Sequence, residues 1–478
     1  MIVLFKGVFM NIILEKEEKY NLWDYKIGSL HLWPLIRSNI FIKYRIKEKG
    51  YTEPHYIANK YTILSPKLWK QHLRTFNLLN FNNSCFDVLF FNTAVLRYFN
   101  KEKGFYENRL YGKYFESFSK LLNFESNFRG FFPNALSKYE NTFIFETLTI
   151  LLKLNQEINK YKLSSVTRND IAPFLKAINL AFPGIISRDC IETVITKNLN
   201  SFPIIKQFYF NKIIPRIRNK IAFVHCASYL DSMSILTKIL HSAGFKVIEV
   251  QHGFVSKEHY AYNYPQYCID NNHHQCREYL PDYLLMFREY WAENIRTPSK
   301  KIVVGYPYLN EISNRLIKYI KPKTKSILIV SQGTVTERMV KIAKKLSQVF
   351  SDYKIIFKLH PGEIPFKERY CSLENLSNIE IIENYNIYEL IAKNNIIIGY
   401  YSTTLFEALK FPEKRIFILE NNDVPDEIGY KFSNIGELIE TIKDNTKGYQ
   451  KANPEYFWAS NWEERFQAFI RNEVNLKI

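Results

Sequence analysis

Cysteine is scarce in this chain. The sequence has six cysteines in 478 residues, and their spacing matches neither a disulfide framework nor a common zinc site. Cys268 and Cys276 bracket two histidines, His273 and His274, but we expect a polar loop there rather than bound zinc. The scarcity excludes a small secreted domain held together by disulfides and favours a reducing cytoplasm.

Long apolar runs are absent as well. The opening stretch MIVLFKGVFMNIIL is apolar but is interrupted by Lys6, and it lacks the small-residue cleavage site of a secretory signal. No later segment reaches the roughly eighteen uninterrupted apolar residues that a membrane-spanning helix needs. We therefore expect a protein that is soluble or bound peripherally to a membrane.

Several catalytic signatures are missing. The sequence has no GxxxxGK[ST] phosphate loop, no GxSxG nucleophile elbow and no HExxH metal motif. The first predicted strand also lacks GxGxxG, which argues against a redox dinucleotide. We expect neither a cofactor nor a metal ion.

Acidic residues are outnumbered. The formal charge is +18, from 65 Lys and Arg against 47 Asp and Glu. The densest basic stretches are 42–50, 213–220 and 317–325, and none has an arginine-rich arm, zinc-finger spacing or an aromatic RNA-binding pattern. Nucleic acid is therefore not expected as a partner, whereas an anionic membrane surface or an anionic substrate fits the charge.

Strand and helix patterns alternate in two stretches of the chain. A helical, aromatic opening (15–80) precedes them, and residues 105–215 look mainly helical. The predicted strands are 85–94, 221–227, 246–253, 282–291 and 300–307, and then 325–334, 354–363, 379–384, 395–404 and 415–421. This alternation is typical of parallel α/β sheets. We predict two Rossmann-like domains, 1–316 and 322–478, with the last helix packing back on the first.

Polar residues follow the predicted strands, where open α/β sheets bind ligands. In IEVQHGF, His252 lies between Gln251 and Gly253 at a strand end. An imidazole titrates near neutrality and can take a proton from a hydroxyl, so we assign His252 as a catalytic base. A plain loop histidine is the alternative. The remaining residues assigned to this side are Glu258 or Glu249, to orient the base, and Gln251, Gly253, Asn92, Thr93, Arg97, His225, Ser228 and Tyr229, to bind the acceptor.

The second domain has three donor-rich loops after strands. KLHPGE places His360 at a strand end, SQGT supplies hydroxyls and a glycine, and YYSTT precedes a predicted helix. Hydroxyls and N–H groups at such a position bind anions, although plain helix capping is the alternative. Together the loops predict a nucleotide phosphate, with His360 stabilising the leaving phosphate. The residues assigned to the donor are Ser331, Gln332, Gly333, Thr334, Lys358, Pro361, Gly362, Ser402, Thr403, Thr404 and Glu407.

These motifs resemble a known group of enzymes. QHG in a first α/β domain, with KLHPGE and YYSTTLFEAL in a second, is similar to GT-B glycosyltransferases of bacterial capsule and lipopolysaccharide synthesis. The pattern resembles enzymes that use CMP-activated nonulosonic acids or Kdo, and CDP-glycerol glycerophosphotransferases. It covers residues 220–420 and, loosely, the first 80, through WDYKIGSLHLWPLIR. The resemblance implies that His360-Pro361 and Ser402 with Thr403 or Thr404 bind a cytidine nucleotide, and that His252 is the base.

The resemblance also implies a reaction. We expect transfer of a sugar from a nucleotide-activated donor, with a CMP-sugar favoured, to a hydroxyl of a growing glycan or lipid-linked acceptor. The transfer is expected to invert, and the enzyme is expected at the cytoplasmic face of an anionic inner membrane. A CDP-glycerol-type glycerophosphotransferase, a UDP-sugar 2-epimerase and a non-catalytic nucleotide-binding subunit remain as alternatives.

Overall fold

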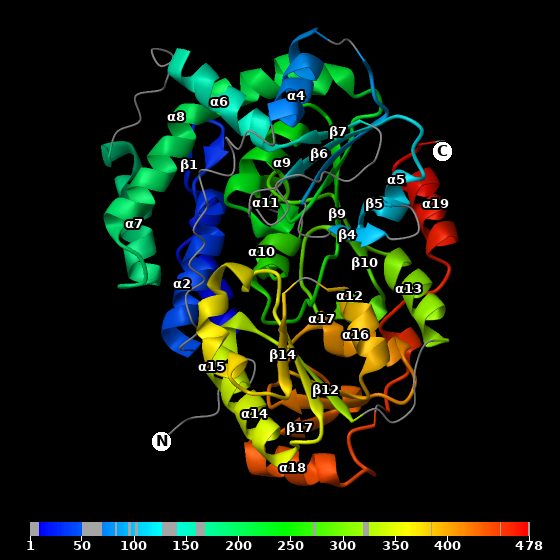
Figure 1. Cartoon of the computed structure of the whole chain (residues 1–478). Coiled ribbons are helices and arrows are strands. Elements are labelled where there is room, and N and C mark those ends of the chain that lie inside the picture. The colour runs from blue at the N-terminus through cyan, green and yellow to red at the C-terminus, as the bar shows by residue number, and fades with distance from the viewer. Residues whose placement is uncertain are drawn as a thin grey trace.

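Two large parallel sheets, one in each half of the chain, organise the molecule (Figure 1). The first sheet lies in the upper part of Figure 1 and the second sheet in the lower part, whereas the last helix returns to the upper part. The computed structural model describes residues 9–49, 69–81, 84–93, 97–100, 104–126, 141–158, 168–270, 274–318, 325–383, 385–449 and 451–476.

The first sheet has seven parallel strands in the order β7-β6-β3-β8-β9-β10-β11. Numbered along the chain this is 3-2-1-4-5-6-7, so the order reverses between β3 and β8, as in a doubly wound Rossmann sheet. The strands are β3 (Val88–Thr93), β6 (Leu121–Ser126), β7 (Thr142–Ile144), β8 (Ile221–Val224), β9 (Lys246–Val250), β10 (Tyr283–Met286) and β11 (Lys300–Val303).

The second sheet repeats this plan with six parallel strands in the order β14-β13-β12-β15-β16-β17. The order along the chain is 3-2-1-4-5-6, and it reverses between β12 and β15. The strands are β12 (Ser326–Val330), β13 (Lys354–Lys358), β14 (Ile379–Ile382), β15 (Ile396–Gly399), β16 (Arg415–Leu419) and β17 (Tyr430–Phe432). Two Rossmann-like domains face one cavity, so the predicted α/β, GT-B arrangement with extra N-terminal helices is confirmed.

Helices and two small antiparallel ribbons complete the domains. In the first half these are α1 (Phe9–Lys19), β1 (Lys26–Ile27) with β2 (Leu30–His31), α2 (Arg37–Lys49), α4 (Trp69–Phe81), β4 (Arg97–Asn100) with β5 (Phe105–Asn108), α5 (Gly112–Phe115), α6 (Glu146–Ile158), α7 (Arg168–Ala181), α8 (Arg188–Lys212), α9 (Ser232–Ser242), α10 (Gln266–Ile269), α11 (His274–Arg277), α12 (Glu289–Glu293) and α13 (Pro307–Ile317). In the second half they are α14 (Thr336–Val349), α15 (Cys371–Glu374), α16 (Ile387–Lys393), α17 (Thr403–Glu407), α18 (Ile435–Lys443) and α19 (Trp462–Asn472).

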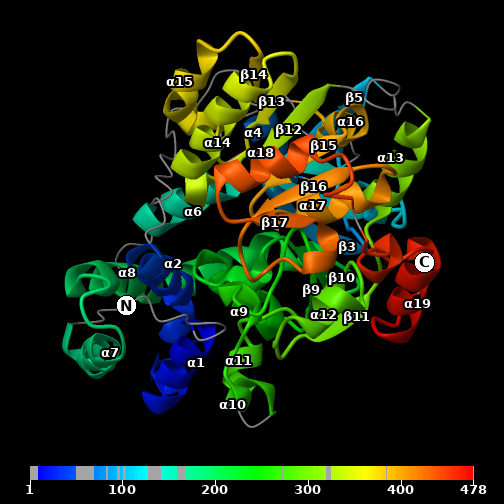
Figure 2. The same cartoon turned by 90° about the horizontal axis from the view of Figure 1, so that it is seen from below.

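The last helix, α19, lies against the first domain (Figure 2). The ring of Phe466 is 4.7 Å from that of Tyr114, and the ring of Phe469 is 5.2 Å from that of Tyr283 on β10. The linker expected between the domains, residues 317–321, overlaps residues 319–324, which lie outside the described residues. The exact domain boundary therefore stays a prediction.

The segment 105–215 is mainly helical, as expected, through α5, α6, α7 and α8, but it also contains β5, β6 and β7, which the sequence did not predict. The LLNFES run of β6 carries two polar side chains into the interior. Asn123 accepts a hydrogen bond from Asn92 at 2.7 Å, and Glu125 forms an ion pair with Arg97 at 3.8 Å. These buried polar pairs interrupt the apolar run by which a buried strand is recognised.

One buried ion pair anchors the helical opening of the chain to the first domain. The Arg37 guanidinium lies 2.8 Å from a carboxylate oxygen of Glu17, and both side chains are fully buried. Arg37 also donates to the carbonyl oxygens of Tyr260 and Asn263, at 2.7 and 2.8 Å. The end of the WDYKIGSLHLWPLIR stretch therefore holds the loop that follows β9.

The cysteines differ from expectation in one place. Cys268 and Cys276 form a disulfide, which their spacing did not predict, whereas the other four are free thiols. His273 lies outside the described residues. Among the described residues, no helix combines the length and the apolar character required to cross a bilayer.

We predict that Arg37→Ala lowers the free energy of unfolding by about 3–5 kcal/mol, because it leaves the Glu17 carboxylate buried without its charge partner. Urea denaturation measures the change. Lys354→Ala is the control, since it breaks an exposed pair with Glu380 and should cost less than about 1 kcal/mol. Equal effects of the two substitutions would contradict the prediction.

Candidate functional site

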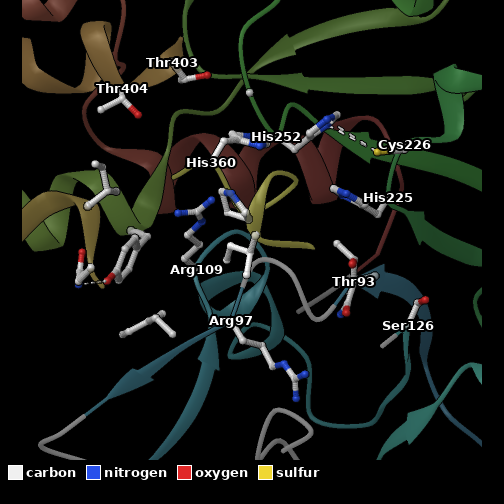
Figure 3. A pocket seen from close by; sticks show the side chains of 18 of the residues that line it. Thr93, Arg97, Arg109, Ser126, His225, Cys226, His252, His360, Thr403 and Thr404 are labelled. Carbon is white, nitrogen blue, oxygen red and sulfur yellow. Dashed lines mark hydrogen bonds between the residues drawn. The ribbon is translucent and has the colours of Figure 1, made fainter. Parts of the chain in front are cut away.

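A cavity of about 1890 Å³ lies between the two domains. Its walls come from the carboxyl ends of both sheets, including the loops beside both points of strand reversal. Such crevices are where doubly wound sheets bind ligands. Figure 3 shows the histidines of the two domains, His252 and His360, in the same part of this cavity.

The cavity brings together most of the residues assigned from sequence. Those in its wall are Asn92, Thr93, Arg97, His225, Tyr229, His252, Gly253, Gln332, Lys358, His360, Pro361, Ser402, Thr403, Thr404 and Glu407. Those outside it are Ser228, Glu249, Gln251, Glu258, Ser331, Gly333, Thr334 and Gly362. Glu258 is half-buried in the loop after β9, and its proposed contact with the base stays a prediction.

The loop after β9 touches the start of α17 in the other domain. A Cβ added to Gly253 would lie 3.5 Å from the hydroxyl oxygen of Thr403, which is van der Waals contact. The ring of Phe254 lies 5.9 Å from that of Tyr401. His252, the residue before this contact, is therefore next to the hydroxyls of α17.

Gln251 shapes this turn without lining the cavity. Its side-chain Nε2 donates to the Gly253 carbonyl at 2.9 Å, and its Oε1 accepts from the Phe287 N–H at 3.0 Å. The side chain is fully buried. The sequence assigned Gln251 to acceptor binding, but these bonds use its amide to brace the backbone that carries His252.

His252 is held in a cluster of hydrogen-bonding side chains. Its Nε2 lies 3.4 Å from the Tyr229 hydroxyl, which lies 3.2 Å from Nε2 of His259. The Ala261 N–H donates to Nδ1 of His259, so the proton of that neutral ring is on Nε2 and points to Tyr229. The Tyr229 oxygen can accept from the Nε2–H groups of both His259 and His252, which leaves the lone pair of the neutral His252 ring on Nδ1.

Burial keeps His252 uncharged. It lowers the pKa of His252 to about 4, and burial followed by the nearby Arg45 lowers the pKa of His259 to about 3. A neutral imidazole near pH 7 has the lone pair that a base needs. The Cys226 sulfur lies 3.8 Å from Nε2 of His252, and the His225 ring centroid lies 4.8 Å from that of His252.

His360 presents a donor to the cavity. Its Nδ1 accepts from the Gly362 N–H at 3.0 Å, so the proton of the neutral ring is on Nε2. Its own backbone N–H donates to the Ser331 hydroxyl at 2.8 Å. The ring is exposed at the end of β13, where its Nε2–H can meet an anionic oxygen.

A buried carboxylate supports the His360 loop. Glu363 accepts hydrogen bonds from the hydroxyls of Ser331 and Tyr370, and from the His360 N–H at 3.3 Å. A Cβ on Gly333 would lie 3.3 Å from the Glu363 side chain, so the SQGT loop packs closely on it. Ser331, assigned to the donor from sequence, is 1% exposed and uses its hydroxyl within the loop.

The YYSTT loop caps a helix and also lines the cavity. The Ser402 hydroxyl accepts from the Thr404 N–H at 3.2 Å, so the capping role considered from sequence is present. The side chains of Thr403 and Thr404 are half-buried in the cavity wall, on the side opposite the first domain's histidines (Figure 3).

Two cations flank these hydroxyls. Arg109 is half-buried in the wall, and within the described part of the chain no hydrogen bond or ion pair holds its guanidinium. Although burial alone would lower the pKa of Arg109, Tyr306, Tyr388 and Glu407 raise it. Lys358 donates to two backbone carbonyls, and burial, followed by the charge of Arg109, lowers its pKa to about 8. Adjacent cations of this kind suit a phosphate group.

Glu407 is on this wall as a buried acceptor. It is 7% exposed, accepts from the Tyr388 hydroxyl at 2.9 Å, and has a pKa raised by burial and opposed by Arg109. It therefore balances part of the Arg109 charge.

The acceptor side contains a buried oxygen in need of a donor. Asn92 is 5% exposed, and its Oδ1 has no hydrogen-bond partner among the described residues, whereas its Nδ2 donates to Asn123. Arg97 also lines the cavity, but its charge is matched by Glu125 and its side chain points away from the histidines in Figure 3.

Sequence reasoning missed Arg109, Cys226, Tyr306 and Tyr388. Arg109 follows the short β5 ribbon strand and belongs to no motif. Tyr306 was recoverable, since it follows β11 in GYP, at the kind of strand end that was searched elsewhere.

No protein-family profile and no curated protein matches the chain. Among solved structures, the UDP-GlcNAc 2-epimerase from Neisseria meningitidis bound to UDP-GlcNAc is 12% identical over 80% of this chain and 98% of its own, with a TM-score of 0.44. The Methanocaldococcus jannaschii UDP-GlcNAc 2-epimerase in complex with UDP-GlcNAc and UDP is 13% identical over 80% and 98%, with a TM-score of 0.43. The wall teichoic acid polymerase TagF is 14% identical over 87% and 93%, with a TM-score of 0.39. Sequence identities and TM-scores this low do not indicate a function for this chain.

The titration of His252 tests the burial argument. Because burial lowers its pKa to about 4, its ring resonances should keep their neutral-form shifts from neutral pH down to about pH 5. NMR of imidazole-labelled protein measures this, with His252→Asn to assign the signal. A midpoint near the ordinary value of about 6.5 would contradict the argument.

Proposed function

We propose that this protein is a glycosyltransferase that moves a sugar from a nucleotide-activated donor to a hydroxyl acceptor. The observation that carries the proposal is the close approach of Gly253 to Thr403, whose hydroxyl would lie 3.5 Å from a Cβ added to the glycine. It supports a site in which the neutral His252 of one domain works with the hydroxyl-bearing wall of the other, to which we assign phosphate binding. A base and an anion site across one interdomain cavity are the parts that such a transfer needs.

The second domain binds the donor. Lys358 and the hydroxyls of Thr403 and Thr404 line the cavity in this domain, and Arg109 reaches the same cavity from the first domain, so these four groups are assigned to the nucleotide phosphate. Nε2–H of His360 donates to the phosphate oxygen that leaves the sugar, and the charge that develops there is stabilised. These cations supply the positive charge, so transfer is expected to proceed in EDTA without a metal ion.

The first domain binds the acceptor. The acceptor oxygen attacks the anomeric carbon while its proton passes to the unprotonated ring nitrogen of His252, and the bond from that carbon to the phosphate oxygen breaks. The nucleotide leaves with the electron pair. A single displacement of this kind inverts the configuration. Asn92 Oδ1 is available to accept a hydrogen bond from the acceptor.

A CMP-sugar is the favoured donor. The support is the resemblance of His360-Pro361 and Ser402-Thr403 to motifs that bind cytidine nucleotides. The same resemblance gives the second candidate, a CDP-glycerol-type glycerophosphotransferase, whose HG histidine corresponds to His252. In that reaction the acceptor oxygen attacks phosphorus, and product mass distinguishes the two. A UDP-sugar 2-epimerase needs no acceptor, and a cavity of about 1890 Å³ exceeds the roughly 300–1,000 Å³ of a single-ligand pocket.

A membrane contact fits the exposed face of α4. Trp69, Leu73 and Phe81 are 61, 55 and 77% exposed, and the neighbouring side chains include Lys70 and Arg74. The helix has no acidic residue. Exposed aromatic and aliphatic side chains among basic ones suit an anionic bilayer surface. We place the enzyme at the cytoplasmic face of such a membrane.

The opposite face of α4 fixes the helix to the first domain. Thr75 accepts from the Ile144 N–H at 3.3 Å, and His72 bonds the Thr147 hydroxyl at 2.9 Å at the start of α6. The exposed face is therefore held in a set orientation.

One set of variants distinguishes residues that bind the nucleotide from the residue that catalyses the transfer. Wild-type protein is screened by thermal shift with CMP, CDP, UDP and GDP, because a ligand of the native state raises the midpoint by mass action. We expect the largest shift with a cytidine nucleotide. Thr403→Val and Arg109→Ala should reduce that shift. His252→Asn should keep it and lower kcat of transfer by about 10²–10⁴, the usual contribution of a general base.

Thr446→Val is the matched control for Thr403→Val, since Thr446 is exposed and outside the cavity. It should leave both the shift and kcat unchanged. Near-normal transfer by His252→Asn would contradict the base assignment, and absence of any nucleotide shift would contradict the function.

The membrane contact is tested by co-sedimentation with vesicles of phosphatidylserine and phosphatidylcholine. Trp69→Ser and Leu73→Ser should each weaken binding about tenfold, since burying one such side chain is worth about 1.5–3 kcal/mol. Leu180→Ser is the control, because Leu180 is 56% exposed on α7. Binding that is insensitive to the α4 variants would contradict this orientation.

A further inference from the structure

One arm of the cavity has a different chemistry from the rest. It runs from the ends of β3 and β7 between α6, α8 and α9, and its lining comes from these helices. Most of the side chains that form it are apolar or aromatic, namely Phe145, Leu152, Ile205, Tyr209, Met233 and Leu236. Thr149 and Asn198 add two uncharged polar groups, and Glu146, at the start of α6, is the charged side chain that these helices contribute to the lining.

The arm is open space within the packing of the first domain. Leu152, Ile205 and Met233 are half-buried, pack against the surrounding core and face the cavity. Protein interiors are packed to the density of organic crystals, and unfilled apolar space lowers stability. An apolar space of this kind is typical of a ligand site.

The arm joins the reaction site at a defined place. Phe91, at the end of β3, has its ring 5.8 Å from that of Phe145 and 6.3 Å from that of Tyr209, and its carbonyl accepts from the His225 N–H at 2.8 Å. His225 is next to His252. The end of the arm at Phe91 therefore lies close to His225 and His252.

Polar side chains mark the mouth of the arm. Thr93 and Ser126 are register partners at the ends of β3 and β6 and lie beyond His225 in Figure 3. Ser126 donates to Glu146 at 3.2 Å. A ligand that fits both parts has an uncharged apolar chain and a hydroxylated head group.

We infer that the arm binds the hydrocarbon chain of an amphiphilic acceptor, whose sugar-like head group lies at the mouth with a hydroxyl toward His252. The inference rests on the proposed transferase function and specifies its acceptor. The acceptor fills the part of the cavity beyond the donor wall. The helix α4, whose other face is exposed, packs on β7 and α6, two of the elements that border the arm.

The experiment uses hexyl, octyl and decyl glucoside below their micelle concentrations, with binding measured by calorimetry on the full chain. Each CH₂ that enters an apolar site is worth about 0.8 kcal/mol, a factor of about three to four in affinity. We expect Kd to fall about tenfold with each pair of added CH₂ groups until the arm is full.

Variants locate the effect. Leu152→Lys and Met233→Lys put a charge into the arm and should abolish the dependence on chain length. Leu154→Lys is the matched control, since Leu154 is on the same helix and 54% exposed. It should leave the dependence intact. Ile205→Trp fills the arm without a charge and should shorten the longest chain that gains affinity.

A rise of the thermal unfolding midpoint on adding nucleotide shows that a variant is folded. The same measurement distinguishes failure of the acceptor inference from failure of the proposed transferase function. A normal nucleotide shift with Kd independent of chain length in wild-type protein overturns the inference and leaves the transferase. Equal loss in Leu154→Lys and Leu152→Lys also overturns it. A missing nucleotide shift in wild-type protein overturns the proposed function itself.

Discussion

The reversal of strand order within each sheet is the constraint on which the site depends. Loops on the two sides of a reversal leave the sheet toward opposite faces and open a crevice between them. One crevice lies between β3 and β8 and the other between β12 and β15, and both contribute to a single cavity. His225 and Thr403 are placed by this topology, and His252 and His360 follow the strands next to it. The approach of the histidines to the wall that contains Thr403 is therefore a property of two sheets facing each other.

Much of the polar chemistry around the site is used to hold loops in place. Gln251 braces the turn of His252, Glu363 gathers the loop of His360, and Arg37 ties the chain's opening to the segment after β9. Each is buried and bonded at several atoms, and a buried polar group left without partners is costly. Such groups fix a backbone as firmly as apolar packing does. The groups that face the cavity are thereby held in position before any substrate arrives, which is the arrangement that electrostatic catalysis requires.

The sequence predicts five of the six strands of the second sheet, because these are mainly apolar runs, as parallel strands buried on both faces are. It does not predict β17, which has three residues, one of them a lysine. It predicts the first sheet less well, because β6 carries Asn123 and Glu125 inside and no longer resembles a buried strand. At the site, residues that follow strands were found from local pattern alone. Arg109 was not, since its place in the cavity depends on how a two-stranded ribbon folds over the sheet, and no local pattern records that. Nor does a motif distinguish Ser331, which bonds within its loop, from Thr403, which lines the cavity.

The return of α19 to the first domain means that the chain crosses between the domains twice, once after α13 and once before α19. Near these crossings the first domain is bonded to the segment before α19, since Asn310 of α13 donates to the carbonyl of Ala459 at 3.0 Å and Gly305 leaves no room for a Cβ beside that same carbonyl. Two covalent connections restrict the relative motion of two domains more than a single linker does, so this return helps to keep the two walls of the cavity aligned.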